Sequence, residues 1–127
     1  MSSPNTSSSP DAPSSQEVPL APCPETPNCE RAERTYSVRP DALFQAAQTA
    51  LESLGPVELR VHTEDQQASA VVRVALLFKD DVDVAVVPQD DGSTLHVRSA
   101  SRVGYSDLGV NRRRVDRLFR AVDEALP

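Results

Sequence analysis

In the middle of the chain, apolar residues recur at every second position. In the regions on both sides, apolar residues recur at the three- and four-residue spacing of an α-helix. Four stretches have the alternation or the Val-rich composition of strands, and they cover residues 57–62, 68–78, 82–87 and 94–100. A short extended stretch is also predicted at residues 35–38. Apolar and polar residues alternate in this way along strands that have one buried and one solvated face. Other parts of the chain must therefore cover the apolar face of the sheet.

Two amphipathic helices are predicted to provide that cover. The first spans residues 40–54, with Pro40 in the first helical position and Gly55 and Pro56 as the stop. The second spans residues 112–126, with Asn111 as its N-cap. The apolar stripes are Leu43, Phe44, Ala47, Leu51 and Leu54 in the first helix, and Val115, Leu118, Phe119, Val122 and Leu126 in the second.

The order of these elements is β-α-β-β-β-β-α. It predicts an α+β fold with an antiparallel sheet of four to five strands and both helices packed on one face. Hairpin turns are expected at residues 63–67, 79–81 and 89–92. The last is the clearest, because Asp91-Gly92 readily supplies the positive φ angles of a tight hairpin turn.

The first part of the chain has almost nothing to bury. Residues 1–21 are dominated by Ser and Pro, so we predict a disordered tail there, followed by a single domain over residues 22–127. The N-terminus has neither the basic start nor the apolar stretch of a secretory signal. No run approaches the roughly 18 apolar residues of a membrane span. These features predict a cytoplasmic protein without a transmembrane segment.

The charge of the chain is unevenly distributed. The net charge is −6, which on average repels nucleic acid and anionic membranes. Residues 98–120 nevertheless contain seven arginines and only two acids, which leaves an excess of five positive charges in that segment. Nucleic-acid binding would need more positive charge and more stacking aromatics than this chain has, so nucleic acid is not an expected partner.

Cysteine and histidine give little indication of chemistry. Cys23 and Cys29 could form a disulfide-closed loop, remain as inert thiols, or take part in metal or redox chemistry, and the first two alternatives are favoured. His62 and His96 fall on predicted polar strand faces, where we expect solvated side chains. Neither lies at zinc-finger spacing from the cysteines, so no metal site or cofactor is predicted.

The segment from Arg98 to Arg114 is the most unusual part of the sequence, because three arginines stand at a predicted helix start. The helix dipole disfavours cations there by up to about 1 kcal/mol each. One explanation, which we favour, is internal pairing of arginines with Asp107 and with the acids at positions 80, 81 and 83. The other is a bound anion. The candidate binding residues are Arg98, Ser99, Ser101, Arg102, Ser106, Asp107, Asn111 and Arg112. The helix face carrying Arg113, Arg117 and Arg120 is expected to be a solvated basic ridge.

These segments together resemble a known family. The run Cys-Pro-x-x-Pro-Asn-Cys at 23–29, the run at 78–84 and the long run at 98–114 are similar to those of the "domain of unknown function 1499" family, over about residues 23–126. The resemblance implies a small domain of bacteria and plant plastids, often exported or next to membrane segments, and implies no activity. The signature positions are Cys23, Asn28, Cys29, Asp80, Asp81, Arg98, Ser99, Ser101, Arg102, Gly104, Ser106, Asp107, Gly109, Asn111 and Arg112.

Two functions fit these observations. The first is a non-catalytic binding or scaffold domain with a polar site around the 101–112 loop for a small anion, a lipid head group or a protein partner. The second is a hydrolase or transferase that uses a Ser or Asp of residues 99–107. The first is favoured, and no catalytic residue is assigned, because the sequence shows no general base for a nucleophile. A histidine close to Ser101 or Ser106 would favour the enzyme.

Overall fold

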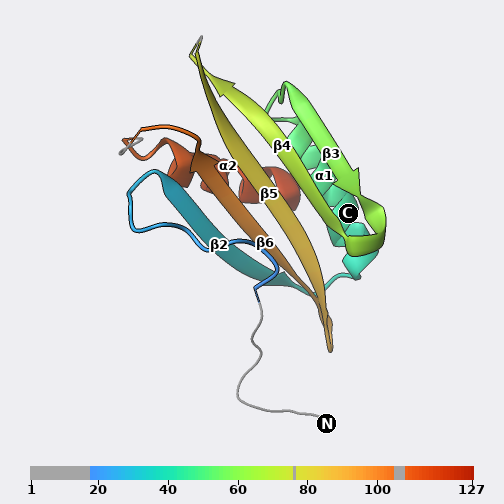
Figure 1. Ribbon diagram of the computed structural model, residues 1–127. Helices are drawn as coiled ribbons and strands as arrows, with labels where there is room; N and C mark the ends of the chain where they lie inside the picture. Colours follow the sequence, from blue (N-terminus) through green and yellow to red (C-terminus); the bar gives the residue numbers. More distant parts are fainter. Residues whose placement is uncertain (1–17, 76, 105–107) are drawn as a thin grey trace.

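The computed structural model describes residues 18–75, 77–104 and 108–127 (Figure 1). Most of the predicted tail, residues 1–17, lies outside this part of the chain, as do Ser106 and Asp107. The elements are β2 (Cys29–Tyr36), α1 (Pro40–Glu52), β3 (Glu58–His62), the short 3₁₀ helix η1 (Thr63–Asp65), β4 (Gln67–Val74), β5 (Phe78–Gln89), β6 (Gly92–Ser101) and α2 (Val110–Ala125).

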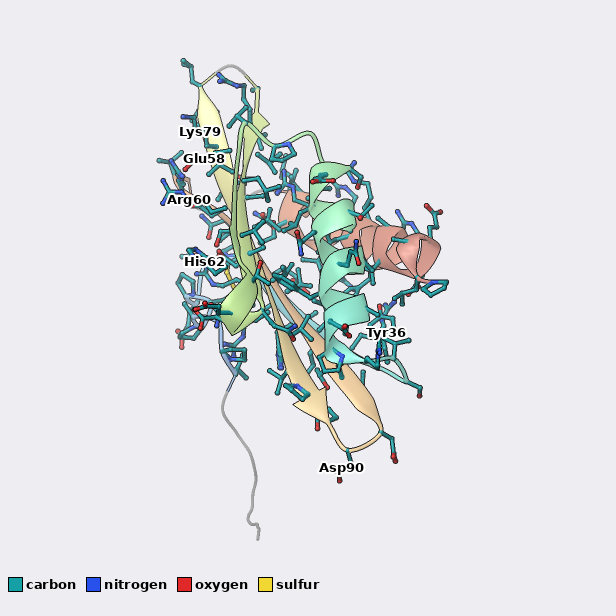
Figure 2. All side chains as sticks on the ribbon, turned by 90° about the vertical axis from the view of Figure 1, so that its right-hand side faces the viewer. Tyr36, Glu58, Arg60, His62, Lys79 and Asp90 are labelled. Atoms are coloured by element: carbon teal, nitrogen blue, oxygen red, sulfur yellow. A yellow bond between two sulfur atoms is a disulfide. The ribbon has the colours of Figure 1, made fainter. Side chains whose placement is uncertain are left out.

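The five strands form one sheet in the order β2-β6-β5-β4-β3, and all neighbouring strands are antiparallel. Figure 1 shows α1 and α2 on the same side of this sheet, and Figure 2 shows the two layers from the side. The predicted α+β fold, with an antiparallel sheet and both helices on one face, is therefore confirmed. We call the side that the helices cover the helix face and the opposite side the outer face.

The core lies between the helix face and the two helices. Alternate residues of the central strands point into it, among them Val82 and Val84 of β5 and Leu95 and Val97 of β6. The predicted helix stripes are buried against them: Leu43, Phe44, Ala47 and Leu51 of α1, and Val115, Leu118, Phe119 and Val122 of α2. Each fully buried Val or Leu contributes roughly 1.5–3 kcal/mol relative to an exposed one, so these stripes hold the layers together.

Helix α1 and the last hairpin agree with the predictions. Pro40 begins α1, and Gly55, with a φ of 67°, follows its end, although the helix ends at Glu52 rather than at residue 54. Gln89 pairs with Gly92 across a two-residue turn, as predicted. The positive φ expected at this turn does not occur at Gly92, which is needed for a different reason given in the Discussion.

The first strand was predicted in the wrong place. Residues 35–38 were expected to be extended, whereas β2 begins at Cys29 and ends at Tyr36. Among the described strands this edge strand pairs with β6 alone, and half of its eight side chains are exposed, three of them charged. Only Ala32 and Tyr36 pack against the core. The apolar alternation that indicates a strand is therefore almost absent from its sequence.

The predicted turn at residues 79–81 is wrong, because these residues belong to β5. The predicted strand over 68–78 ends at Val74, and the next strand already begins at Phe78. Ala75, with a φ of 58°, lies in the actual turn between them. Asp80 pairs across the sheet with Val72 on one side and Ser101 on the other. Two adjacent acids are typical of a turn, but here a distant arginine allows Asp80 to be buried in a strand.

The start of the second helix also differs from the prediction. Gly109, with a φ of 82°, occupies the N-cap position, and α2 begins at Val110. Asn111 is therefore inside the helix and is buried, rather than capping it. Its side chain binds groups from other elements, as described below.

Candidate functional site

A buried ion pair lies where β5, β6 and the first turns of α2 meet. Arg114 of α2 donates from Nη1 to Oδ2 of Asp80 at 2.7 Å. Asp80 is 2% exposed and Arg114 is 5% exposed, so both charges are removed from water. An unpaired charge in such a position is strongly unfavourable, so each residue requires the other.

Ser99 and Asn111 extend this pair into a network. The hydroxyl of Ser99 donates to Oδ1 of Asn111 at 2.6 Å. Nη1 of Arg114 donates to the same Oδ1 at 2.9 Å and to Oγ of Ser99 at 3.2 Å. Asn111 is 1% exposed and Ser99 is fully buried. One guanidinium nitrogen therefore joins β5, β6 and α2. We call Asp80, Ser99, Asn111 and Arg114 the buried polar network.

The amide nitrogen of Asn111 attaches two further segments to the network. It donates to the backbone oxygen of Asn28 at 3.0 Å and to Oγ of Ser101 at 2.9 Å. The side chain of Asn28 in turn donates to the backbone oxygen of Gly104 at 2.7 Å. Residue 28 is held in this position by the loop that the Cys23–Cys29 disulfide closes. Of the alternatives left open for the two cysteines, the structure contains the disulfide.

A mainly apolar cavity of about 390 Å³ adjoins the network on the helix face. It lies at the end of the sheet where β4, β5 and β6 approach the start of α2. Its lining consists of Val74, Phe78, Lys79, Asp80, Ser101, Val103, Gly104 and Val110. Asp80 and Ser101 are shared between the cavity and the hydrogen bonds just described. The cavity thus has mainly apolar walls with a small number of polar groups, as ligand sites commonly do.

The outer face carries a second, polar depression of about 360 Å³. It is lined by three arginines and three acids, and four of these six side chains form pairs: Arg60 with Glu58 at 2.6 Å, and Arg102 with Asp81 through two hydrogen bonds of 2.9 and 3.0 Å. Figure 2 shows Glu58, Arg60 and His62 on this face, away from the helices. Because the acids already neutralise these arginines, the depression has little attraction for an anion.

The predicted binding residues do not converge on one site. Ser99, Ser101 and Asn111 meet around Arg114, and Arg102 pairs with Asp81 on the outer face. Arg98 also lies on the outer face, where it donates to the backbone oxygen of Pro22 at 3.4 Å. Arg112 is exposed in the first turn of α2. Ser106 and Asp107 lie outside the described residues, so their predicted roles stay predictions.

Arg114 is the residue that sequence reasoning missed. Arg112 was predicted as a binding residue and Arg113 as part of the exposed ridge, but Arg114 was given neither role. Arg112 and Arg113 are exposed and Arg114 is buried. Position 114 follows Asn111 by three residues and precedes Leu118 by four, which places it on the apolar stripe. Its pairing with Asp80 agrees with the internal explanation for the arginines. The ridge of Arg113, Arg117 and Arg120 is exposed, as predicted.

His96 was expected to be solvated, and that expectation is wrong. It is 7% exposed on the outer face, and its Nδ1 atom lies 3.4 Å from the carboxylate of Glu33. Burial lowers the pKa of His96 below its ordinary value of 6.5, although Glu33 acts in the opposite direction. His62 is exposed, as predicted.

The lowered pKa of His96 predicts a pH-dependent stability. The unfolded chain takes up the proton near pH 6.5 and the folded protein only at lower pH. The free energy of unfolding should therefore fall as the pH is lowered from 6.5 through the folded-state pKa. Urea unfolding across this window should show a smaller decline for His96→Gln than for the unmodified protein. Identical declines in the two proteins would show that His96 does not cause the pH dependence of stability.

Within residues 18–75, 77–104 and 108–127, no three His, Cys, Asp or Glu side chains gather in a way that could hold a metal ion. Among the helices described, none is long and apolar enough to cross a membrane.

The fold and the signature residues define a small α+β domain built around a buried Asp–Arg network. The chain belongs to the family described as "Protein of unknown function (DUF1499)", whose model matches residues 3–122. The resemblance noted in the sequence is thereby confirmed. No curated protein sequence matches the chain.

Solved structures of low sequence identity are similar to this chain. The di-domain ARO/CYC StfQ from the steffimycin biosynthetic pathway is 11% identical with a TM-score of 0.56, over 76% of this chain and 44% of that one. The chain thus spans less than half of StfQ. Ara h 8.0201 is 13% identical with a TM-score of 0.55, over 76% of this chain and 95% of that one. A protein from Chromobacterium violaceum is 12% identical over the same shares, with a TM-score of 0.49.

Proposed function

We propose that this protein is a non-catalytic binding domain that takes a small amphipathic molecule into the cavity beside the buried polar network. The observation that carries the proposal is the cavity itself. At about 390 Å³ it falls in the range of roughly 300–1,000 Å³ typical of small-molecule sites. Its walls come from Val74, Phe78, Val103 and Val110, and Asp80 and Ser101 supply polar atoms.

The polar side of the cavity indicates which chemical group the ligand presents. Oγ of Ser101 accepts a hydrogen bond from Asn111, so its own proton can be donated to a ligand oxygen. Asp80, the other polar side chain of the lining, is neutralised by Arg114. An apolar body with an oxygen acceptor, such as a carbonyl or a carboxylate group, therefore fits best. We therefore propose the cavity, rather than the region of Arg98, Arg102 and Arg112, as the position of the anion that the sequence suggested.

The arrangement of the histidines supports binding rather than hydrolysis. Residues alternate between faces along a strand, so Ser99 and Ser101 of β6 lie on the helix face and His96 on the outer face. His62 is also on the outer face (Figure 2). Ser99 is further engaged by Asn111 and Arg114. In the described chain, neither histidine can act as a base for these two serines.

Binding of anilinonaphthalene sulfonate, an amphipathic anion, tests the proposal. We expect its fluorescence to rise with the folded protein, and amide NMR shifts to change mainly at the residues that line the cavity. Val110→Trp should fill the space and weaken binding at least about tenfold, because a filled cavity cannot bury the probe. Val61→Trp, an exposed position on β3, is the matched control and should bind as the unmodified protein does.

Three results would reject the cavity as the site. The first is a set of shift changes confined to the outer face, and the second is equal binding by the Val110 and Val61 variants. The third is a fluorescence rise without cooperative thermal unfolding, since loosely packed states also bind such probes.

A further inference from the structure

Apolar side chains are unusually exposed at one end of the sheet. Leu77 is 86% exposed and Leu108 is 85% exposed, more than any other large apolar residue in the described ranges. Phe78 and Val103 are about half exposed. Single exposed apolar residues are normal on a protein surface, but four of the seven exposed large apolar residues found here belong to two neighbouring segments. We call Leu77, Phe78, Val103 and Leu108 the apolar tip.

The strand register brings the two segments together. Phe78 begins β5 next to Val74, and Asp80, two residues further, pairs with Ser101 at the end of β6. The backbone nitrogen of Arg102 also donates to the backbone oxygen of Lys79. Phe78, Val103 and Val110 line the same cavity, and Leu108 precedes Val110 by two residues.

Positive charge surrounds the apolar tip. Lys79, Arg112 and Arg113 are exposed beside it, and Arg113 donates to the backbone oxygen of Leu108 at 3.1 Å. The nearby acids of β5 are already paired, Asp80 with Arg114 and Asp81 with Arg102. The opposite end of the sheet carries Asp90 and Asp91 in the β5–β6 hairpin, and Figure 2 shows Asp90 far from Lys79. A chain of net charge −6 thus has one end that combines cations with exposed apolar groups.

From this combination we infer that the apolar tip docks onto the surface of an anionic membrane, with Leu77 and Leu108 inserted and Lys79, Arg112 and Arg113 at the level of the head groups. A stable protein interface buries roughly 1,200–2,000 Å² in good shape complementarity, which four side chains on two loops do not provide. A lipid surface requires no such complementarity. Shallow insertion of apolar groups and attraction of cations to anionic lipids act together in binding of this type.

The inference goes beyond the proposed function and does not rest on it. Both can hold together, because the cavity has Phe78 and Val103 in its wall, and its ligand could then enter from the membrane. The two are separable by experiment. Val110→Trp blocks the cavity without changing the exposed leucines, so it should abolish probe binding and leave membrane binding unchanged.

Sedimentation with vesicles tests the docking directly. The full chain should bind vesicles of phosphatidylcholine with phosphatidylglycerol, bind those of phosphatidylcholine alone far less, and be released by high salt. Leu77→Gln and Leu108→Gln should each lower the partition coefficient about tenfold, as expected for removing one inserted Leu side chain. Lys79→Gln and Arg112→Gln should each lower it about fivefold.

Matched controls come from elsewhere on the surface. Val61→Gln removes an exposed apolar side chain on β3, and Arg39→Gln removes an exposed cation before α1, at the other end of the sheet. Both should bind vesicles as the unmodified protein does. Equal losses in tip and control variants, or binding that ignores lipid charge, would overturn the inference. So would self-association that Leu77→Gln abolishes in a protein without affinity for vesicles, since the occupant would then be a second copy of the chain.

Discussion

Replacing Asp80 with alanine should lower the free energy of unfolding by about 3–5 kcal/mol, because it leaves Arg114 buried without its counter-charge. Arg114 is 5% exposed and cannot turn to water without leaving the place where α2 joins the sheet. The free energy of unfolding of a small domain is about 5–15 kcal/mol in total, so this loss is a large fraction of the stability. Urea unfolding followed by circular dichroism measures it.

Two further variants distinguish a buried ion pair from a general requirement for an acid in β5. The double variant Asp80→Ala, Arg114→Met removes both charges and should be roughly 2 kcal/mol more stable than Asp80→Ala alone. Asp81→Ala, in the adjacent position, removes only the partner of Arg102 on the outer face. That pair is partly exposed, and exposed pairs contribute little, so stability should change far less.

The double variant also keeps the prediction testable if Asp80→Ala does not fold. Recovery of a cooperative unfolding transition on removing Arg114 as well would support the pairing. A double variant less stable than the single one would contradict it, since Arg114 would then contribute mainly through Ser99 and Asn111.

The helices and central strands could be predicted from the sequence because local patterns determine them. An amphipathic helix repeats its apolar residues within four positions, and a half-buried strand alternates in steps of two. Leu43 to Leu51, Val115 to Val122 and the strands around Val84 and Val97 all follow these rules. Elements whose core contacts are few, such as β2 with Ala32 and Tyr36, have no such pattern.

The candidate site was only partly predictable, because its polar residues are buried by partners far away in the sequence. Asp80 and Arg114 are separated by 34 positions, and Asn111 binds the backbone of Asn28, 83 positions before it. No local sequence pattern indicates that an acid in a strand is paired with an arginine of a distant helix. The family resemblance marked Asp80 and Asn111 but not their contacts, and the cavity depends on four separate segments.

Replacing Gly92 with alanine should be the most destabilising change of a glycine in this protein, at about 3 kcal/mol. A Cβ atom added there would overlap the backbone oxygen of Tyr36 and lie 3.0 Å from its carbonyl carbon. Both are backbone atoms, so neither can move aside by a bond rotation, as the end of a flexible side chain could. The neighbouring Ser93 is fully buried and donates to the backbone oxygen of Val38 at 2.8 Å, so the segment leading into α1 is fixed against β6 at this point.

Gly55→Ala provides the control that separates this overlap from ordinary backbone strain. Gly55 has a φ of 67°, but a Cβ added to it would meet no atom within 4 Å. Its replacement should therefore carry only the left-handed penalty of roughly 1–2 kcal/mol. Thermal unfolding of both variants compares the two effects. If Gly92→Ala were as stable as Gly55→Ala, residues 36–38 would be able to move aside without a loss of stability. The close packing of β2 on the β5–β6 hairpin would then not be the reason for a glycine at position 92.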